Sequence, residues 1–426
     1  MDRALRIAVV GCGTAGGATA LFLARAGHAV AVYERVPEPG PIGAGITLQP
    51  TGQAVLARLG LLAPILAGGT RVDRLWVRSR SGRTILDLRY REVAADLFGI
   101  GLHRGVLFET LVGAARAEPG ITLRCGIEIV SLRRDGNQRW LGARGGDVLG
   151  PFDLVVIADG AASELRGHST IRHRTRLYPW GALWYVADDP DRRFAGEVLQ
   201  VVDGPRRMFG VLPTGTAPRG DHAVASLFWS IRGDRVAAWR AAGLAPWKAE
   251  CLRLDARAAP LLDQIADPAQ VLFAPYRDVA MRRWHEPGVV FLGDAAHATS
   301  PQLGQGVNLA LWDAMTLADA IAATPELDAA LAAYTQARRR HLNYYQFATR
   351  ALTPLFQSDA RVLGWIRDRL FPMSRWLGPL RRRMVTTMAG LDRGIVRRPI
   401  QLREIRGLLA AGRSTAAGAG PSVPQA

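Results

Sequence analysis

Cysteine and lysine are scarce in this sequence of 426 residues. The three cysteines, Cys12, Cys125 and Cys251, lie far apart and form no C-x-x-C pair. We therefore expect no disulfide framework and a reducing, cytoplasmic location. Lys248 is the only lysine among the 54 basic residues. Because arginine replaces lysine throughout, the net charge of +17 reflects composition, and we expect no nucleic-acid partner.

Long apolar runs are also missing. No window holds about 18 uninterrupted apolar residues, so no transmembrane helix is expected. The first 24 residues are not a signal peptide, because four glycines interrupt their apolar stretch. The sequence has no metal-ligand spacing and no G-x-S-x-G motif, so we expect neither a bound metal nor a serine nucleophile. The length is sufficient for two or three domains.

The most informative stretch that is present is residues 6–34, which is typical of a strand, a glycine turn, a helix and a second strand. Gly11, Gly13 and Gly16 form G-x-G-x-x-G directly after an apolar run. In a dinucleotide-binding turn these glycines permit the tight bend, the approach of the backbone to a pyrophosphate and the close packing of the helix. The helix start offers free N–H groups to phosphate. Glu34, at the end of the second strand, is placed to accept hydrogen bonds from a ribose.

Two further apolar strands and an unusual middle region define the expected organisation. Residues 153–158 are predicted to form a strand that ends at Asp159-Gly160, and residues 289–292 another that ends at Gly293-Asp294. A long helix at about residues 306–323 is predicted to follow. Short aromatic-rich strands between them indicate an inserted sheet. We predict an α/β fold with five parts, namely a nucleotide-binding domain in two parts (1–177 and 277–335), an inserted sheet domain (178–276), a basic helical C-terminal region (336–411) and a disordered tail (412–426).

Three motifs occur here in the order that a known family shows. The fingerprint of residues 6–34, DLVVIADGAASELR (153–166) and GDAAHATSPQLGQGVNLALWDAMTLADAI (293–321) resemble the single-component FAD-dependent aromatic hydroxylases, which include p-hydroxybenzoate and salicylate hydroxylases. Residues 43–62 and LHRGVLFETL (102–111) are similar to the salicylate hydroxylase branch. The resemblance covers about residues 5–350. It implies a Rossmann-like FAD-binding domain of the p-hydroxybenzoate hydroxylase type with an inserted mixed β-sheet substrate domain and a helical C-terminal region.

The resemblance also implies an activity. FAD would be bound non-covalently, NAD(P)H would reduce it, and a flavin C4a-hydroperoxide formed with O2 would hydroxylate a small phenolic or quinone-like ring. Pro301 would lie beside the reacting face of the flavin, and Asp294 would contact its ribityl chain. A single glycine fingerprint indicates that NAD(P)H visits only transiently. The expected FAD-binding residues are Gly11, Gly13, Ala15, Gly16, Glu34, Arg35, Arg104, Asp159, Asp294, Gly304, Gly306, Val307 and Asn308.

Other functions stay open on these residues. A flavin halogenase shares the glycine fingerprint, but the W-x-W-x-I-P stretch and the catalytic lysine of halogenases are absent. An FAD-dependent dehydrogenase or prenyl-chain reductase would not transfer oxygen, and a non-catalytic flavin-binding protein is a further alternative. One departure from the family is Ile157, where a glycine is usual. It weakens the assignment of nicotinamide contacts to Asp159.

Several residues have structural interpretations beside the functional ones. Asp294 could cap the next helix. His297 is either a catalytic base or a helix-start histidine satisfied by backbone, and its position favours the second. Cys12 is interpreted as a small filler of the turn. Six aromatic residues are predicted to wall the substrate site, although each is also typical of plain core: Trp180, Trp184, Tyr185, Phe209, Phe228 and Trp229.

Positive charge is concentrated in the C-terminal region. Residues 336–426 contain 17 arginines and 4 acids. Residues 361–371 have near-helical apolar spacing, with Arg361, Arg367 and Arg369 around the apolar positions, and the run Arg381-Arg382-Arg383 follows. Two interpretations stay open, a helical cap packed on the flavin domain and a basic helix at a membrane interface. An acidic carrier protein is a third, and the oligomeric state stays undetermined.

Overall fold

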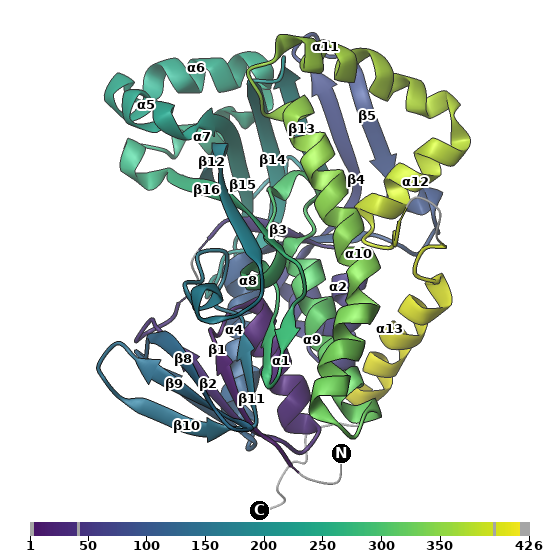
Figure 1. Cartoon of the computed structure of the whole chain (residues 1–426). Coiled ribbons are helices and arrows are strands. Elements are labelled where there is room, and N and C mark those ends of the chain that lie inside the picture. Colours follow the sequence, from purple (N-terminus) through teal and green to yellow (C-terminus); the bar gives the residue numbers. More distant parts are fainter. Residues whose placement is uncertain (1–3, 41–42, 395–397, 418–426) are drawn as a thin grey trace, which may run out of the picture.

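Two large sheets with helices around them form the molecule (Figure 1). The computed structural model describes residues 4–40, 43–394 and 398–417. The first sheet has six strands in the order β17-β18-β11-β1-β2-β7, parallel except for the pair β17–β18. These strands are β1 (Arg6–Val10), β2 (Ala29–Glu34), β7 (Ile121–Cys125), β11 (Leu154–Ile157), β17 (His285–Glu286) and β18 (Val289–Phe291). The three apolar runs predicted as buried strands are confirmed as β1, β11 and β18 at its centre.

Short side chains let the helices beside this sheet pack closely against one another. Helix α1 packs against α9 and α4, and a methyl group on Gly17 would already lie 3.4 Å from Cβ of Leu111. A small antiparallel sheet, β10-β9-β8, contacts β1 and β11. The helices of this part are α1 (Thr14–Arg25), α2 (Pro50–Arg58), α3 (Leu62–Gly68), α4 (Arg104–Ala117), α8 (Asp294–His297) and α9 (Gly306–Ala323). The small sheet consists of β8 (Ile129–Asp135), β9 (Gln138–Ala143) and β10 (Val148–Phe152).

The second sheet has nine strands and extends beyond the predicted insertion at residues 178–276. Its order is β16-β12-β15-β14-β13-β4-β6-β3, with β5 paired to β4. The chain therefore contributes two separate segments to this sheet, first residues 45–103 and later residues 173–281. Its strands are β3 (Gly45–Leu48), β4 (Thr70–Ser79), β5 (Thr84–Arg89), β6 (Gly99–His103), β12 (His173–Asp188), β13 (Gly196–Asp203), β14 (Arg207–Thr216), β15 (Ala223–Arg232) and β16 (Leu272–Met281). Long-range pairing of this kind cannot be read from strand patterns alone.

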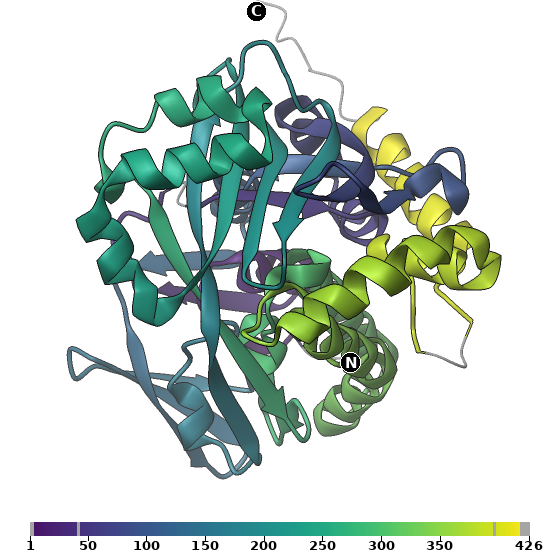
Figure 2. The ribbon, with the colours of Figure 1, turned by 90° about the horizontal axis from the view of Figure 1, so that it is seen from above.

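The two faces of the nine-stranded sheet belong to different cores. On one face Phe209, Trp229 and Leu183 pack with helices α5 (Val236–Ala242), α6 (Leu244–Leu254) and α7 (Ala259–Asp263). On the other face Phe228 and Trp184 join the core that contains β1, α1 and α9. Figure 2 shows α5–α7 on one side of the sheet and α10 on the other. The two faces can join different cores because successive side chains along a strand point to opposite faces of the sheet.

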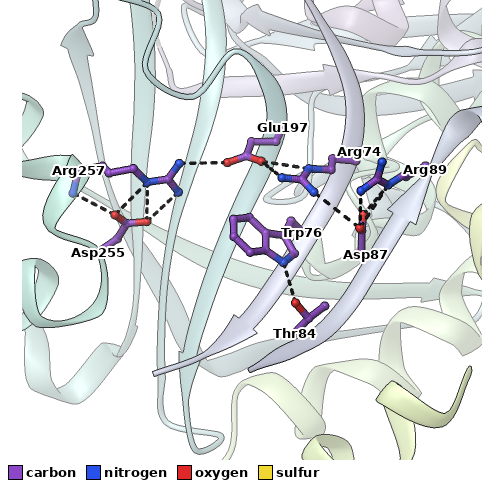
Figure 3. A network of polar contacts seen from close by, with 8 residues as sticks. All are labelled: Arg74, Trp76, Thr84, Asp87, Arg89, Glu197, Asp255 and Arg257. Carbon is purple, nitrogen blue, oxygen red and sulfur yellow. Dashed lines mark hydrogen bonds and ion pairs between the residues drawn. The ribbon is translucent and has the colours of Figure 1, made fainter. Parts of the chain in front are cut away.

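A chain of ion pairs connects the early and the late segment of this sheet (Figure 3). Strands β13 and β4 are parallel neighbours. Across them Nε of Arg74 donates to Glu197 at 3.0 Å, and Arg257 reaches the second carboxylate oxygen of Glu197 at 3.4 Å. Arg74 also lies 3.6 Å from Asp87 on β5. Because Glu197 is largely buried, these pairs are less screened by solvent than surface pairs.

Four helices complete the described chain, α10 (Leu327–Phe356), α11 (Arg361–Leu370), α12 (Gly378–Met388) and α13 (Leu402–Ala417). Within the described ranges no helix combines the length and apolar character needed to cross a bilayer. Helix α13 continues to Ala417, so the prediction of disorder from residue 412 is wrong for its first six residues. Residues 418–426 lie outside the described part.

Candidate active site

The glycine turn at the carboxyl end of β1 separates two roles of glycine. A methyl group on Gly11 would lie 2.7 Å from the carbonyl oxygen of Ala158, and one on Gly16 would lie 1.9 Å from that of Gly11. Both approaches are shorter than a side chain tolerates. Gly13, at the N-cap of α1, has no such neighbour within 4 Å. Gly11 and Gly16 are thus required by protein packing, whereas the space beside Gly13 is open.

Glu34 holds the turn from the neighbouring strand. Its carboxylate accepts from the backbone N–H of Cys12 at 2.9 Å and from that of Val36 at 3.0 Å. Cys12 is fully buried, and burial raises the pKa of its thiol to about 12, with the Glu34 carboxylate adding to the shift. Such a thiol is not a nucleophile at neutral pH, which agrees with its interpretation as a filler. Arg35 is exposed.

Arg166 joins the second and third motifs. It is buried, and its two terminal nitrogens donate to the carbonyl oxygens of Ala295 and Ala161, both at 2.8 Å. Burial lowers the pKa of this guanidinium and raises that of the neighbouring Asp159 carboxyl. The contact fixes the loop after β11 to helix α8. Ile157, the departure from the family pattern, is fully buried at the end of β11.

Asp294 lies where the motifs meet. A methyl group on Gly293 would lie 2.9 Å from Cβ of Ala15, and one on Gly306 would lie 3.9 Å from the Asp294 carboxylate. The third motif therefore touches both the first helix and the turn before α9. Asp294 is exposed, and Gly293 occupies the N-cap position of α8. The alternative that Asp294 merely caps this helix is wrong.

The turn from Ser300 to Gln305 is fixed from two helices behind it. Ser300 shares a 2.6 Å hydrogen bond with Thr353 of α10. Nε2 of Gln302 donates at 2.8 Å to Gln357, which follows the end of α10. Nε2 of Gln305 donates at 2.8 Å to the carbonyl of Met388 at the end of α12. The same turn leaves Pro301, Gly304 and Gly306 exposed.

Asn308 connects the start of α9 to the nine-stranded sheet. Its Oδ1 accepts from the backbone N–H of Gln49 at 2.8 Å, and its Nδ2 donates to the carbonyls of Thr47 and Gly304, both at 3.1 Å. The side chain is thus committed to protein contacts. A cofactor contact of Asn308 would have to use its backbone. Val307 is half-buried against the same core.

A buried charge network lies behind this turn. Asp313 of α9 accepts from the backbone N–H of Gly293 at 3.0 Å, pairs with Nε2 of His297 at 2.6 Å and receives Nε of Arg338 at 2.7 Å. Arg338 also contacts Nδ1 of His341 at 2.6 Å, and Nε2 of His341 lies 3.1 Å from the carbonyl of Gly390. All four side chains are at most 4% exposed.

Charge in the network follows from these contacts. Burial opposes ionisation of Asp313, but His297 and Arg338 outweigh it and lower its pKa to about 2. Burial, reinforced by Arg338, lowers the pKa of His341 well below its usual range. Nε2 of His297 pairs with a carboxylate, so the expectation of a backbone partner is wrong.

The nine-stranded sheet reaches the turn through Gln357. Its Nε2 donates to Ser230 Oγ at 2.9 Å and to the carbonyl of Gly181 at 3.3 Å, while its Oε1 receives Gln302. Trp184 and Phe228 stand on this face with ring centroids 5.1 Å apart. Tyr185, Phe209 and Trp229 pack on the opposite face, so their predicted place in the wall of the substrate site is wrong. Trp180 is buried.

Arg104 begins α4 beside the first strand of that sheet. Its side chain passes Gly43, where an added methyl group would lie 3.2 Å away, and its backbone N–H donates to the carbonyl of Ala44 at 3.2 Å. Gly45 presses on the sheet, since an added methyl group would lie 2.7 Å from Oγ1 of Thr214. Arg104 is exposed. These contacts place the predicted arginine beside the β3 edge of the nine-stranded sheet.

Comparisons with known proteins agree with this geometry. Residues 4–345 match the family model described as FAD binding domain. The chain is 32% identical over 369 residues to kynurenine 3-monooxygenase of Salinispora arenicola, covering 79% of this chain and 76% of that protein. It is 27% identical over 406 residues to a probable 2-heptyl-3-hydroxy-4(1H)-quinolone synthase of Rhodococcus erythropolis, covering 93% and 96%. Among solved structures, PqsL, a probable FAD-dependent monooxygenase from Pseudomonas aeruginosa, superposes with a TM-score of 0.74 at 26% identity, covering 85% of this chain and all of that one.

The chain therefore belongs to the FAD-binding domain family. Its relatives are FAD-dependent aromatic hydroxylases, and this protein is an FAD-dependent monooxygenase that uses NAD(P)H as co-substrate, as is typical of the family. The fold and the cofactor expected from the sequence are confirmed.

Sequence reasoning missed or underrated three residues that hold the site together. Arg166 lies in the second motif but was given no definite role, and Asp313 and Arg338 were not singled out. A signal for Asp313 was present, since it is one of only two acids in the largely apolar helix predicted at residues 306–323. A charge on a buried helix face requires a partner. That partner, Arg338, lies 25 positions away, and no local spacing points to it.

Proposed function

We propose that this enzyme inserts one oxygen atom of O2 into a small electron-rich aromatic ring, held between the nine-stranded sheet and the turn of residues 300–308. The observation that carries the proposal is the convergence of the three motifs. Gly11 touches the strand end before Asp159, Gly293 touches Ala15, and Gly306 approaches Asp294. Gly293 and Ala15, 278 positions apart in sequence, thus meet at the carboxyl edge of the parallel strands, where ligands bind in open α/β sheets.

The residues present fit successive parts of an FAD molecule. The amides at the start of α1 face open space beside Gly13, which suits a pyrophosphate. Glu34 keeps lone pairs for a ribose diol, and Asp294 and Arg104 are exposed at the same edge. Oδ1 of Asp159 is buried and has no hydrogen-bond partner among the described residues. A buried polar atom of this kind calls for a ligand or water.

The chain's own contribution to the chemistry is to position and to exclude water. When bound and reduced by NAD(P)H, FAD supplies the activation of O2. The free N–H groups at the start of α9 favour negative charge on the reduced ring. Trp184 and Phe228 shield the substrate side, and the pinned turn holds Pro301 at the reacting face. Exclusion of water protects the activated oxygen from loss as H2O2.

Isotope labelling tests the proposal. Holoenzyme is incubated with NAD(P)H and ¹⁸O2 over a panel of phenols, aminophenols, quinols and alkyl-chain aromatics. We expect a product that carries one labelled oxygen and NAD(P)H oxidation that depends on the substrate. A product whose new oxygen comes from water, or oxidation of a substrate without oxygen transfer, would instead support a dehydrogenase.

A further inference from the structure

We propose that the surface formed by α11, residues 371–376 and the start of α12 docks the enzyme on an anionic lipid bilayer. This surface, the α11–α12 surface, comprises residues 361–382. Of the fourteen large hydrophobic side chains exposed in the described residues, seven lie between Val362 and Leu380. They are Val362, Trp365, Leu370, Met373, Trp376, Leu377 and Leu380. Scattered exposed hydrophobic residues are ordinary, but seven of them within one short segment indicate an interaction site.

One face of helix α11 packs on the protein, and the opposite face is exposed. Gly364 lies against Pro205, where an added methyl group would approach to 2.7 Å. Arg367 is fully buried over the ring of Phe356 at 5.1 Å and donates to the carbonyl of Leu355 at 2.9 Å. Its predicted role as a surface cation is therefore wrong. The opposite helix face carries Val362 and Trp365, which are 59% and 58% exposed.

The cations that remain on this surface are unpaired. Arg361, Arg369, Arg375 and Arg382 are exposed and form no ion pair among the described residues. The only acid between residues 360 and 391 is Asp368, which pairs with the buried Arg367 at 2.7 Å. The surface thus combines an apolar centre with four uncompensated positive charges.

The predicted run of three arginines does not act as a unit. Arg381 binds Glu92 at 2.7 Å and Arg383 binds Asp392 at 2.9 Å, so both serve the packing of α12. Only Arg382 of this run is exposed. The buried arginines attach this layer to the protein, as the cap interpretation expects. The exposed arginines face outward, as the interfacial interpretation requires.

Side-chain geometry favours a bilayer over a second copy of the chain. Arg369 stacks on Trp365 at 4.9 Å and Arg375 on Trp376 at 4.6 Å, which places a charge beside each indole. Tryptophan and arginine together suit the boundary between headgroups and acyl chains. A symmetric dimer through this surface would oppose identical sets of positive charges. In Figure 1, α11 lies at the end of the molecule farthest from the six-stranded sheet.

Liposome flotation of the FAD-loaded enzyme tests the proposal. One set of vesicles contains phosphatidylcholine alone. The other also contains phosphatidylglycerol at about one lipid in three, which gives a clear negative surface potential. We expect flotation with the anionic vesicles at low salt and its loss at high salt. The variant Arg361→Gln, Arg369→Gln, Arg375→Gln, Arg382→Gln should lose vesicle affinity by about fivefold per arginine. Replacement of Trp365 and Trp376 by Ser should weaken binding with little change in its salt dependence.

A matched control variant distinguishes the effect of the α11–α12 surface on vesicle binding from the effect of the protein's net charge. Arg124, Arg133, Arg235 and Arg240 are exposed and unpaired elsewhere in the described chain, and their replacement by Gln removes the same charge. This control variant should float like the wild type, and flavin absorbance should be equal in all variants. Equal loss in both sets, or no flotation of the wild type at low salt, would overturn the proposal. So would a wild-type dimer in light scattering that Trp376→Ser makes monomeric, or capture of an acidic protein without vesicle binding.

Discussion

At the scale of single residues, the glycines of one turn have different roles. Gly16 is required because a methyl group there would lie 1.9 Å from the Gly11 carbonyl oxygen. Gly13 has open space and a backbone that other residues adopt. The two positions therefore separate folding from cofactor binding.

Gly13→Asp should abolish FAD binding without unfolding the protein. Aspartate is a favoured N-cap residue and should hold or slightly raise the stability of α1, but its charge would oppose the pyrophosphate. Flavin absorbance per protein and the thermal midpoint of the FAD-free form give the two readouts. Gly13→Asn, of similar size without the charge, should retain more FAD. Gly13→Asp protein that purifies fully yellow would show that this turn does not hold the pyrophosphate.

Asp313→Asn should cost about 3 kcal/mol of unfolding free energy, because it leaves the buried Arg338 without its carboxylate. It should also weaken FAD binding, since Asp313 holds the N–H of Gly293 next to Asp294. Urea unfolding and flavin release measure the two effects. Asp319→Asn, on the same helix, removes a half-exposed carboxylate paired with Arg58 and should cost at most about 1 kcal/mol. Similar losses in both variants would contradict the assigned role of the network.

At the scale of elements, strand alternation decides which aromatic residues face the substrate. Neighbours on β12 belong to different cores, with Trp184 on the flavin-domain side and Tyr185 on the side of α5–α7. Sequence texture alone could not assign these sides, because both faces of the sheet are apolar.

Replacing each of these neighbours by Leu compares the two faces directly. Trp184→Leu should lower kcat/KM by about 10- to 100-fold and divert NAD(P)H oxidation toward H2O2, because water enters the site. Tyr185→Leu should lower stability and leave the ratio of product to NAD(P)H unchanged. Peroxide assay and product quantification measure this ratio. An unchanged ratio in Trp184→Leu would place the substrate elsewhere.

At the scale of the whole molecule, buried histidines should make stability depend on pH. Burial lowers the pKa of His28, His103, His285 and, most strongly, His341. Below pH about 6.5 the unfolded chain binds protons at these residues, and the folded chain binds them less readily because burial opposes the charge. The unfolding free energy should therefore be fully present above this pH and fall as the pH falls, by about 1.4 kcal/mol per pH unit for each such proton.

His341→Gln should flatten this profile by about one proton's slope. Urea unfolding between pH 7.5 and 5, a range that extends roughly one and a half units below the histidine pKa, measures this slope. His168→Gln, at an exposed position, should leave the slope as in the wild type. An unchanged slope in His341→Gln would mean that this side chain is protonated in the folded protein.

What the sequence determined by itself was local. The turn at Gly11–Gly16, the strands that end at Asp159 and Asp294 and the helix from residue 306 to 323 depend on glycine spacing, apolar runs and helical periodicity, all of which act between near neighbours. The helix at residues 361–371 was predicted for the same reason. These elements carry the family motifs, so the fold class and the cofactor followed from them.

What only the tertiary structure decided involves contacts distant in sequence. The joining of residues 45–103 and 173–281 into one sheet, the pairing of Asp313 with Arg338, and the burial of Arg367 beside an exposed Arg369 leave no local pattern. Each depends on which faces become buried when the two sheets meet. A buried charge must find a partner wherever the packed chain brings one, because leaving it unpaired costs more than the network that satisfies it.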